Sequence, residues 1–469
     1  MSLTKFVGLL AGSTLTLTGV SYGATEANND TTAQINQLKA EIAQMKAAQG
    51  DQWLTEQRAE QIRGVVQDVL ADSSTRSSFQ QAGGATSGYD NGFFLSSADG
   101  NYKLKINALE QVRFTWGNGY GAAPSSGTGN SPSNNQWGFE NRRTQVFFSG
   151  NVVDPSWKYL VGMAYDSQED PYVRNADQFQ ILYAQVTKTM GNGFSVTVGQ
   201  QNVAFTLQSQ LFNAGSTQMG EYSLFEYAFG AGQQVGLSAK WESDMVRAMG
   251  GWYNAVFLPA NVLTAANSWD AANNQGVALA GRAEVKLAGT WDQFSKESSF
   301  KGEEFGLMVG GGAFWQTARQ ANENPPYGFA PVGLTVDATA KFGGFNLIGQ
   351  LIWQDSYAWD AATADQSTWG FNIQGGAFVT EDLEVFGAWN YNTISTEASN
   401  YLQVGANWYF AKNSMKMSVI GTIPVSATAT TQGGGTAYGQ SYGLLPTGGL
   451  TGNPTGDNFG LVVQLQLMF

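Results

Sequence analysis

The feature that most limits the fold of this chain is a polar–apolar alternation that recurs in strand-length segments from residue 102 onward. The first segment reads YKLKINALEQVRFTW, in which Lys105 and Arg113 share one face and Phe114 lies on the other. We count sixteen such segments, and each predicts a β-strand. They lie near residues 102–116, 140–152, 157–166, 178–188, 194–200, 233–241, 245–254, 276–288, 305–316, 332–342, 345–354, 368–378, 383–391, 400–410, 414–424 and 458–469.

The connections between these segments alternate between short turns, such as 343–344, and long polar loops. The long loops are 117–139, 201–232, 255–275, 355–367 and 425–457. Segment 289–304 departs from this scheme, because a long and highly charged stretch stands where a short turn is expected. Period-2 alternation also suits a soluble β-sandwich, but alternating turn lengths are typical of an outer-membrane barrel. We therefore predict an all-β transmembrane barrel of about 16 antiparallel strands over 102–469.

The final segment, LVVQLQLMF, illustrates how one face of such a strand contacts lipid and the other face lines the pore. Gln464 and Gln466 are expected to face the pore, and the last strand must pair with the first to leave no edge. The residues expected to face lipid are Leu461, Val463, Leu465, Leu467 and Phe469. Tryptophans near strand ends predict interfacial girdles. These are Trp116, Trp157, Trp241, Trp315, Trp353, Trp389 and Trp408.

The N-terminal region differs from the rest of the chain. Residues 1–23 have the pattern of a secretory signal peptide, with the positive charge of Lys5, an apolar stretch and the small–x–small site SYG. After its removal, no run of 18 apolar residues remains to predict a membrane-spanning helix. We expect residues 24–79 to form a helical stalk in the periplasm and residues 80–101 to form a linker.

The stalk prediction rests on a short α-helical coiled-coil pattern. Ile35, Leu38, Ile42 and Met45 follow the 3-4-3 spacing of a coiled-coil seam. Isoleucine at the a positions of such a stalk suits a parallel trimer, so a homotrimer is expected. A single amphipathic helix lying on the barrel explains the same spacing equally well.

Composition excludes several classes of function. The chain has no cysteine and no histidine, which removes thiol chemistry, His general bases and Cys/His zinc sites. A net charge of −13 disfavours nucleic acid as a partner. The carboxylate pairs Glu303-Glu304 and Glu381-Asp382 fall in predicted turns, and the glycines of segment 310–312 precede no helix. We read the pairs as solvated turn charges and the glycines as packing of small residues, with packing between protomers as one option. No catalytic residue, metal site or cofactor is expected, and we predict that the chain is not an enzyme.

Charged residues in the inward phase of the predicted strands are the candidates for setting ion preference. The pore-lining candidates are Lys105, Arg113, Arg143, Arg282, Glu284, Lys286, Asp337 and Lys341. A hairpin register that pairs Trp116 with Glu140 would place Arg113 and Arg143 opposite each other. From the net acidity we expect weak selectivity that leans toward cations.

Loop 201–232 carries large apolar side chains that an external loop would leave in water. Folding this loop into the barrel would bury them and narrow the pore, with Glu221 and Glu226 as candidate constriction carboxylates. A loop that latches onto a neighbouring protomer is the other interpretation.

Several stretches resemble a known family. GFFLSSADGNYKLKINALEQVRF, ENRRTQVFFSGNVVDPSWKYLVGMAY and GGAFVTEDLEVFGAWNY are similar to phosphate-selective-porin-like outer-membrane proteins. QWLTEQRAEQIRGVVQDVLADSSTRSSF followed by GYDNGFFLSSADGNYKLKI resembles the stalked porin-like proteins of planctomycete-type bacteria. The resemblance implies a 16-stranded barrel, a trimer, passage of small solutes and a role of Phe469 as an assembly signal. The arginines here are few and scattered, so phosphate selectivity does not follow.

Three functions are compatible with these observations. The first is an outer-membrane channel through which ions and small hydrophilic solutes diffuse passively, with lipid as its surroundings. The second is a structural outer-membrane protein whose stalk contacts the cell wall. The third is an exported soluble β-rich lectin or adhesin. Conductance in lipid bilayers, envelope attachment through the stalk and solubility without detergent distinguish the three.

Overall fold

The computed structural model describes residues 33, 35–44, 85–118, 135–167, 178–254, 277–316, 329–358, 366–393, 399–426 and 459–469. The chain divides into two units, residues 1–84 and 85–469. In the first unit the described residues are helical, and Ile35 and Leu38 of this helix are exposed. The predicted signal peptide, Met45 and the rest of the predicted stalk from residue 46 to residue 79 lie outside the described residues.

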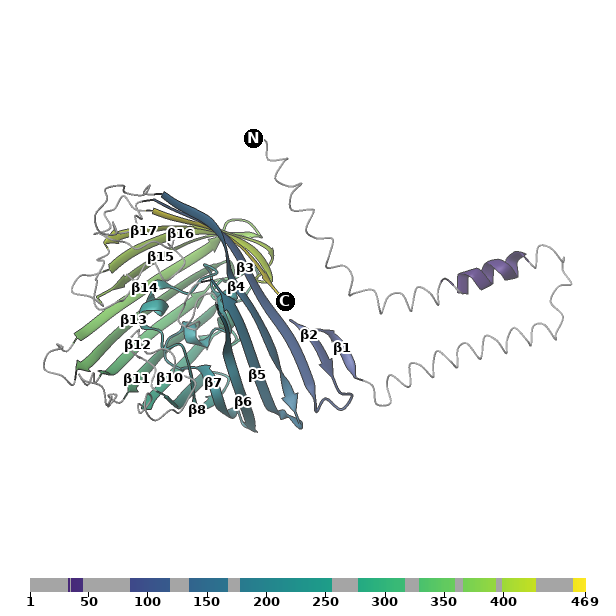
Figure 1. Ribbon diagram of the computed structural model, residues 1–469, viewed down its shortest axis with the longest axis horizontal. Coiled ribbons are helices and arrows are strands. Elements are labelled where there is room, and N and C mark those ends of the chain that lie inside the picture. Colours follow the sequence, from purple (N-terminus) through teal and green to yellow (C-terminus); the bar gives the residue numbers. More distant parts are fainter. Residues whose placement is uncertain are drawn as a thin grey trace. The chain divides into compact units, whose positions relative to one another are not determined.

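The second unit is a closed antiparallel barrel of sixteen strands, β3 to β18 (Figure 1). Each strand pairs with the next along the chain, and β18 closes the barrel on β3, with Leu461 opposite Trp116 and Met468 opposite Leu109. The strands are β3 (Lys103–Asn118), β4 (Asn135–Val152), β5 (Asp154–Asp166), β6 (Phe179–Gly191), β7 (Phe194–Asn202), β8 (Gln233–Glu242), β9 (Val246–Asn254), β10 (Val277–Ala288), β11 (Gly306–Gln316), β12 (Phe329–Lys341), β13 (Phe345–Ala358), β14 (Gln366–Phe378), β15 (Leu383–Asn392), β16 (Ser399–Ala411), β17 (Met415–Ser426) and β18 (Phe459–Met468).

The predicted barrel of sixteen strands is confirmed, but the linker assigned to residues 80–101 is not a plain linker. It contains a hairpin of β1 (Thr86–Tyr89) and β2 (Phe93–Ser96), and β2 pairs with the start of β3. The hairpin adds strand partners to the part of β3 that β18 does not reach. Phe469, the last residue, exchanges backbone hydrogen bonds with Ala108 and packs its ring against Phe93 at 5.9 Å.

The barrel wall has an inside-out distribution of side chains. Gln464 and Gln466 point inward and are buried, whereas Leu465 between them and Leu467 after them face outward. The same holds around the wall, where Asn407 is fully buried while Val336 and Val404 are 59% and 55% exposed. Such a wall buries polar groups inside and presents apolar groups to lipid, so this is a transmembrane barrel. Six of the seven predicted girdle tryptophans are exposed, and Trp116 is half-buried.

The outward face of β12 offers a direct test of this orientation. Arginine in place of Val336 would set a charge in the hydrocarbon region, so Val336→Arg is expected to destabilise the folded barrel by about 2–4 kcal/mol. Urea unfolding in lipid vesicles measures this loss, with Val336→Ala as the matched control. An Arg variant as stable as the Ala variant would show that this face does not meet lipid.

Candidate functional site

The long segment between β7 and β8, residues 203–232, lies inside the barrel and is called the inner loop below. Its base is closed by the hydrogen bond from the amide of Val203 to the carbonyl of Gly232, at 3.0 Å. It contains two single-turn 3-10 helices, η4 (Gln208–Gln210) and η5 (Ala214–Ser216), and the short helix α4 (Leu224–Phe229).

Hydrogen bonds from the barrel wall hold the inner loop on several sides. The Lys416 ammonium donates to the carbonyl of Thr217 at 2.7 Å, and Gln464 and Gln111 both donate to the carbonyl of Gly220. The Asn407 amide donates to the carbonyl of Gln218 at 2.7 Å. These donors come from β3, β16, β17 and β18, so the loop is fixed against the wall from within.

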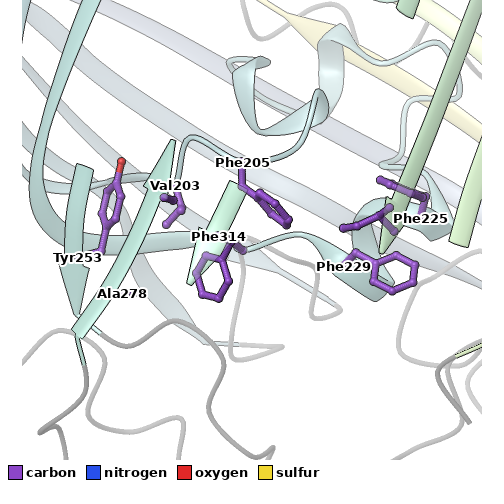
Figure 2. Packing of buried hydrophobic residues seen from close by; sticks show 10 residues of the cluster. Val203, Phe205, Phe225, Phe229, Tyr253, Ala278 and Phe314 are labelled. Atoms are coloured by element: carbon purple, nitrogen blue, oxygen red, sulfur yellow. The ribbon is translucent and has the colours of Figure 1, made fainter. Parts of the chain in front are cut away.

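One group of apolar side chains of the inner loop packs against β9, β10, β11 and β13 (Figure 2). Figure 2 shows Phe205 facing Phe314 and Phe225 beside Phe229, with ring centroids 5.7 Å and 5.4 Å apart. A Cβ atom added to Gly312 would lie 2.3 Å from the carbonyl oxygen of Phe205. This part of the glycine run therefore provides room for the loop within one barrel.

Three arginines converge on one carboxylate of the inner loop. Glu221 is buried, and it accepts from Arg142 Nε at 3.0 Å, from Arg113 Nη1 at 3.2 Å and from Arg143. The Tyr227 hydroxyl donates to the same carboxylate at 2.8 Å. We call Glu221 and these three arginines the latch, because they join the loop to β3 and β4.

A β-bulge in β4 explains how two consecutive arginines reach the same carboxylate. Gln111 pairs with Arg143 and Val112 pairs with Asn141, so Arg142 is the extra residue of the bulge. Both arginine side chains are therefore buried inside the barrel. Strict alternation places Arg142 on the outer face, which is why the sequence does not identify it.

The expected register between the first two barrel strands is wrong. Trp116 pairs with Trp137, not with Glu140, and Arg113 pairs with Glu140, to which it also donates a hydrogen bond. Arg113 and Arg143 are therefore not opposite each other in the hairpin, although the latch brings both to Glu221.

The electrostatics of the latch keep Glu221 ionised. Burial by itself raises the pKa of this carboxyl, but attraction to Arg142, Arg143 and Arg113 outweighs burial and holds the pKa far below its ordinary value. A carboxyl whose pKa is lowered by folding contributes stability above its ordinary pKa, and loses it only as the pH falls through the lowered value. Mild acid therefore leaves the latch intact.

A second ion-pair network lies on β9 to β12. Arg282 donates to both oxygens of Asp337 at 2.7 Å and to Glu284 at 2.7 Å, and Arg247 pairs with Glu284 at 2.5 Å. Arg282 also donates to the carbonyl of Phe205 at 3.3 Å, so this network contacts the inner loop as well. Arg247 also lies 3.8 Å from Glu242, so each arginine of the network faces two carboxylates.

The remaining predicted site residues are dispersed. Lys341 donates to three carbonyls of segment 289–304, Lys286 lies over the ring of Trp291, and Lys105 is half-buried near the start of β3. Glu226 is buried within α4 and accepts from Thr206 at 2.8 Å. Of the turn carboxylates, Glu303 pairs with Lys296 and Glu381 with Lys301.

A cavity of about 590 Å³ lies between the inner loop and the wall formed by β5 to β9. It extends from the strand ends near Lys158 and Lys240 up to Gln201 and Asn202, beside the base of the inner loop. Among the described residues that line it, these two lysines carry the charge. Hydroxyl groups dominate the rest of the polar lining, from Thr187, Thr189, Ser195, Thr197, Ser209, Ser216, Ser238 and Ser295.

None of the eight pore-lining candidates contributes to this cavity. Apart from Lys105, they are engaged in the latch, in the second ion-pair network or with segment 289–304. The cavity is instead lined mostly by neutral residues, which a search for inward charges passes over.

Comparison with solved structures finds outer-membrane barrels, porins among them, of similar fold. No protein-family model and no curated protein matches the chain. An anion-selective porin from Comamonas acidovorans is 12% identical, with a TM-score of 0.50 over 78% of this chain and 99% of that chain. OmpF of Salmonella typhi in complex with daunomycin is 11% identical, with a TM-score of 0.48 over 82% and 100%. OmpT of Vibrio cholerae is 9% identical, with a TM-score of 0.47 over 79% and 98%.

The barrel therefore has the porin fold, a closed antiparallel barrel of sixteen strands. At 12% identity, the porin from Comamonas acidovorans supports the fold alone. Among the described helices, none combines the length and the apolar character needed to cross a membrane.

Proposed function

We propose that this protein is an outer-membrane porin, a channel through which ions and small hydrophilic solutes diffuse passively. The observation that carries the proposal is the inside-out barrel with a polar cavity of about 590 Å³ beside an inward-folded loop. Water-filled space lined by polar side chains is what passive diffusion requires. The classes of the phosphate-selective-porin-like and stalked planctomycete-type proteins remain a resemblance, and phosphate selectivity is not part of the proposal.

The solute route in this proposal runs off-centre, along β5 to β9. Inward residues of the opposite wall are packed under the inner loop, and Gln111 and Gln466 are both fully buried there. Lys158 gives the route a weak positive field, and Lys240 adds less to it because it pairs with Glu242 at 2.8 Å. We propose uncharged hydroxylated solutes and small anions as the preferred class, in place of the cation preference expected from net charge.

The N-terminal region belongs to the same proposal. Residues 1–23 would direct export. Residues 24–79 would form the periplasmic coiled-coil stalk of a homotrimer, and this stalk would contact the cell wall. Exposure of Ile35 and Leu38 on the described helix supports a partner helix, because apolar seam residues need a second surface to cover them. Phe469 is proposed to act as the assembly signal.

Planar-bilayer recording tests the channel proposal directly. The purified full chain is expected to give stepwise conductance increments with a small anion preference in a salt gradient. A heat-modifiable gel shift confirms that the purified barrel is folded. If bilayers that contain this folded protein show no conductance, passive diffusion is contradicted and the tethering function is favoured.

The charge of the route can be inverted at two positions. Lys158→Glu combined with Lys240→Glu is expected to move the zero-current potential from the anion side to the cation side, because it replaces both charged lining residues. Lys188→Glu is the matched control, since Lys188 lies over the ring of Trp157 and does not line the cavity. Equal shifts in the double variant and the control would argue against this route.

A further inference from the structure

Segment 289–304, between β10 and β11, is far longer than the other described turns on the same rim. It includes the 3-10 helix η7 (Gln293–Ser295), and the residues around its middle are buried, including Glu297 at 4% exposure and Phe300 at 6%. A solvated turn of a barrel rim leaves such residues in water. We call this segment the turn insert.

Contacts along the wall place the turn insert inside the barrel. The Lys341 ammonium donates to the carbonyls of Gln293, Lys296 and Ser298, at 2.6, 2.7 and 2.9 Å. Its Phe300 ring lies 5.1 Å from the ring of Tyr409 on β16. The partners thus extend from β12 to β16, so the segment reaches across the inner wall.

The turn insert and the inner loop are joined through one carboxylate. Glu297 accepts from the Gln208 side chain at 2.5 Å, from the amide of Gln218 at 2.7 Å and from the Gln374 side chain at 2.9 Å. The amide of Glu297 donates to the carbonyl of Ser216 at 3.0 Å. The two inserted segments therefore form one packed body.

Both segments also border the open space. Ser295 of the turn insert and Ser216 of the inner loop line the same cavity of about 590 Å³. We infer that the turn insert is a second constriction, entering from the short-turn rim, and that Glu297 determines the size of the solutes that pass by fixing it to the inner loop. This inference rests on the proposed channel function.

Removing the insert tests the inference. In one variant, an Asn-Gly turn replaces residues 290–304, and in a second, Glu297→Ala removes the joint while keeping the segment. Single-channel conductance is expected to rise about twofold in the replacement variant and by a smaller factor in Glu297→Ala, because both widen the water path. The size limit for neutral polymers that enter the pore should rise in the same order. Asp244→Ala, in the exposed turn between β8 and β9, is the control and should match the original chain.

Accessibility of Gln374 gives an independent readout. Gln374 is 1% exposed and bonded to Glu297, and the chain has no cysteine of its own. As a single substitution, Gln374→Cys should react slowly with a charged thiol reagent. The same substitution made in either insert variant should react rapidly. If the original chain conducts and both insert variants match it in conductance, size limit and Gln374→Cys reactivity, the second constriction is overturned. If the original chain itself does not conduct, the channel proposal fails instead.

Discussion

Glu221→Gln is expected to release the inner loop from β3 and β4. The substitution removes the carboxylate that Arg113, Arg142 and Arg143 share. Glu140 beside Arg113 and Asp166 beside Arg143 remain, so the buried positive charges become less well compensated. Removing one partner of a buried ion pair destabilises a folded protein by about 3–5 kcal/mol, mostly because the remaining charge stays buried without compensation. Urea unfolding in lipid vesicles should show a loss of this size.

The same substitution should change the channel as well as its stability. A looser inner loop widens the path, and the uncovered arginines add positive potential to the lumen. We expect a larger single-channel conductance and a stronger anion preference than in the original chain. Lowering the pH to the ordinary carboxyl value of 4.5 should not imitate the variant, because the arginines hold the pKa of Glu221 far lower.

Glu381→Gln is the matched control for this experiment. Glu381 is a rim carboxylate whose side chain is 79% exposed and lies 3.7 Å from Lys301. An exposed pair of this kind contributes little to stability. If Glu221→Gln behaves like Glu381→Gln in both unfolding and conductance, the latch does not hold the loop.

The barrel could be predicted from the sequence because its strands and turns are specified by patterns of neighbouring residues. Lipid on one side and polar groups on the other impose a period of two, and the alternation of short and long connections distinguishes the two rims. The β1–β2 hairpin also had a signal, since Asp90-Asn91-Gly92 between apolar pairs is typical of a tight hairpin. The linker-like composition of residues 80–101 led to the prediction of a linker in place of this hairpin.

The site was less predictable because it depends on departures from regularity. The bulge at Arg142 shifts the register of β4 and turns a residue inward that strict alternation places outside. The apolar side chains of the inner loop did indicate burial, and Glu221 was identified from that reasoning. Its three partners come from residues far away in sequence, which no local pattern specifies.

Neutral cavity residues carry the weakest sequence signal of all. Thr187 and Thr197, whose hydroxyls lie 2.8 Å apart, have the same inward phase as many packed residues. Whether an inward residue meets water or the inner loop is decided by tertiary packing. The anomalous length and charge of segment 289–304 were visible in the sequence, but its inward path was not.

The second large effect is expected from a single thiol placed on the open wall. In this cysteine-free chain, Thr197→Cys puts a reactive group in the cavity between β7 and the inner loop. A charged methanethiosulfonate reagent attached there should lower single-channel conductance by about half or more, because it occupies the narrow solute path. The matched variant is Thr335→Cys on β12, where Thr335 is also inward-facing but 3% exposed.

The comparison of these two cysteine variants in planar bilayers tests the central claim, that solutes pass along β5 to β9 beside a lumen filled by the inner loop. We predict block by the reagent in Thr197→Cys and unchanged conductance in Thr335→Cys. Equal block in both variants, or block in Thr335→Cys alone, would contradict the account.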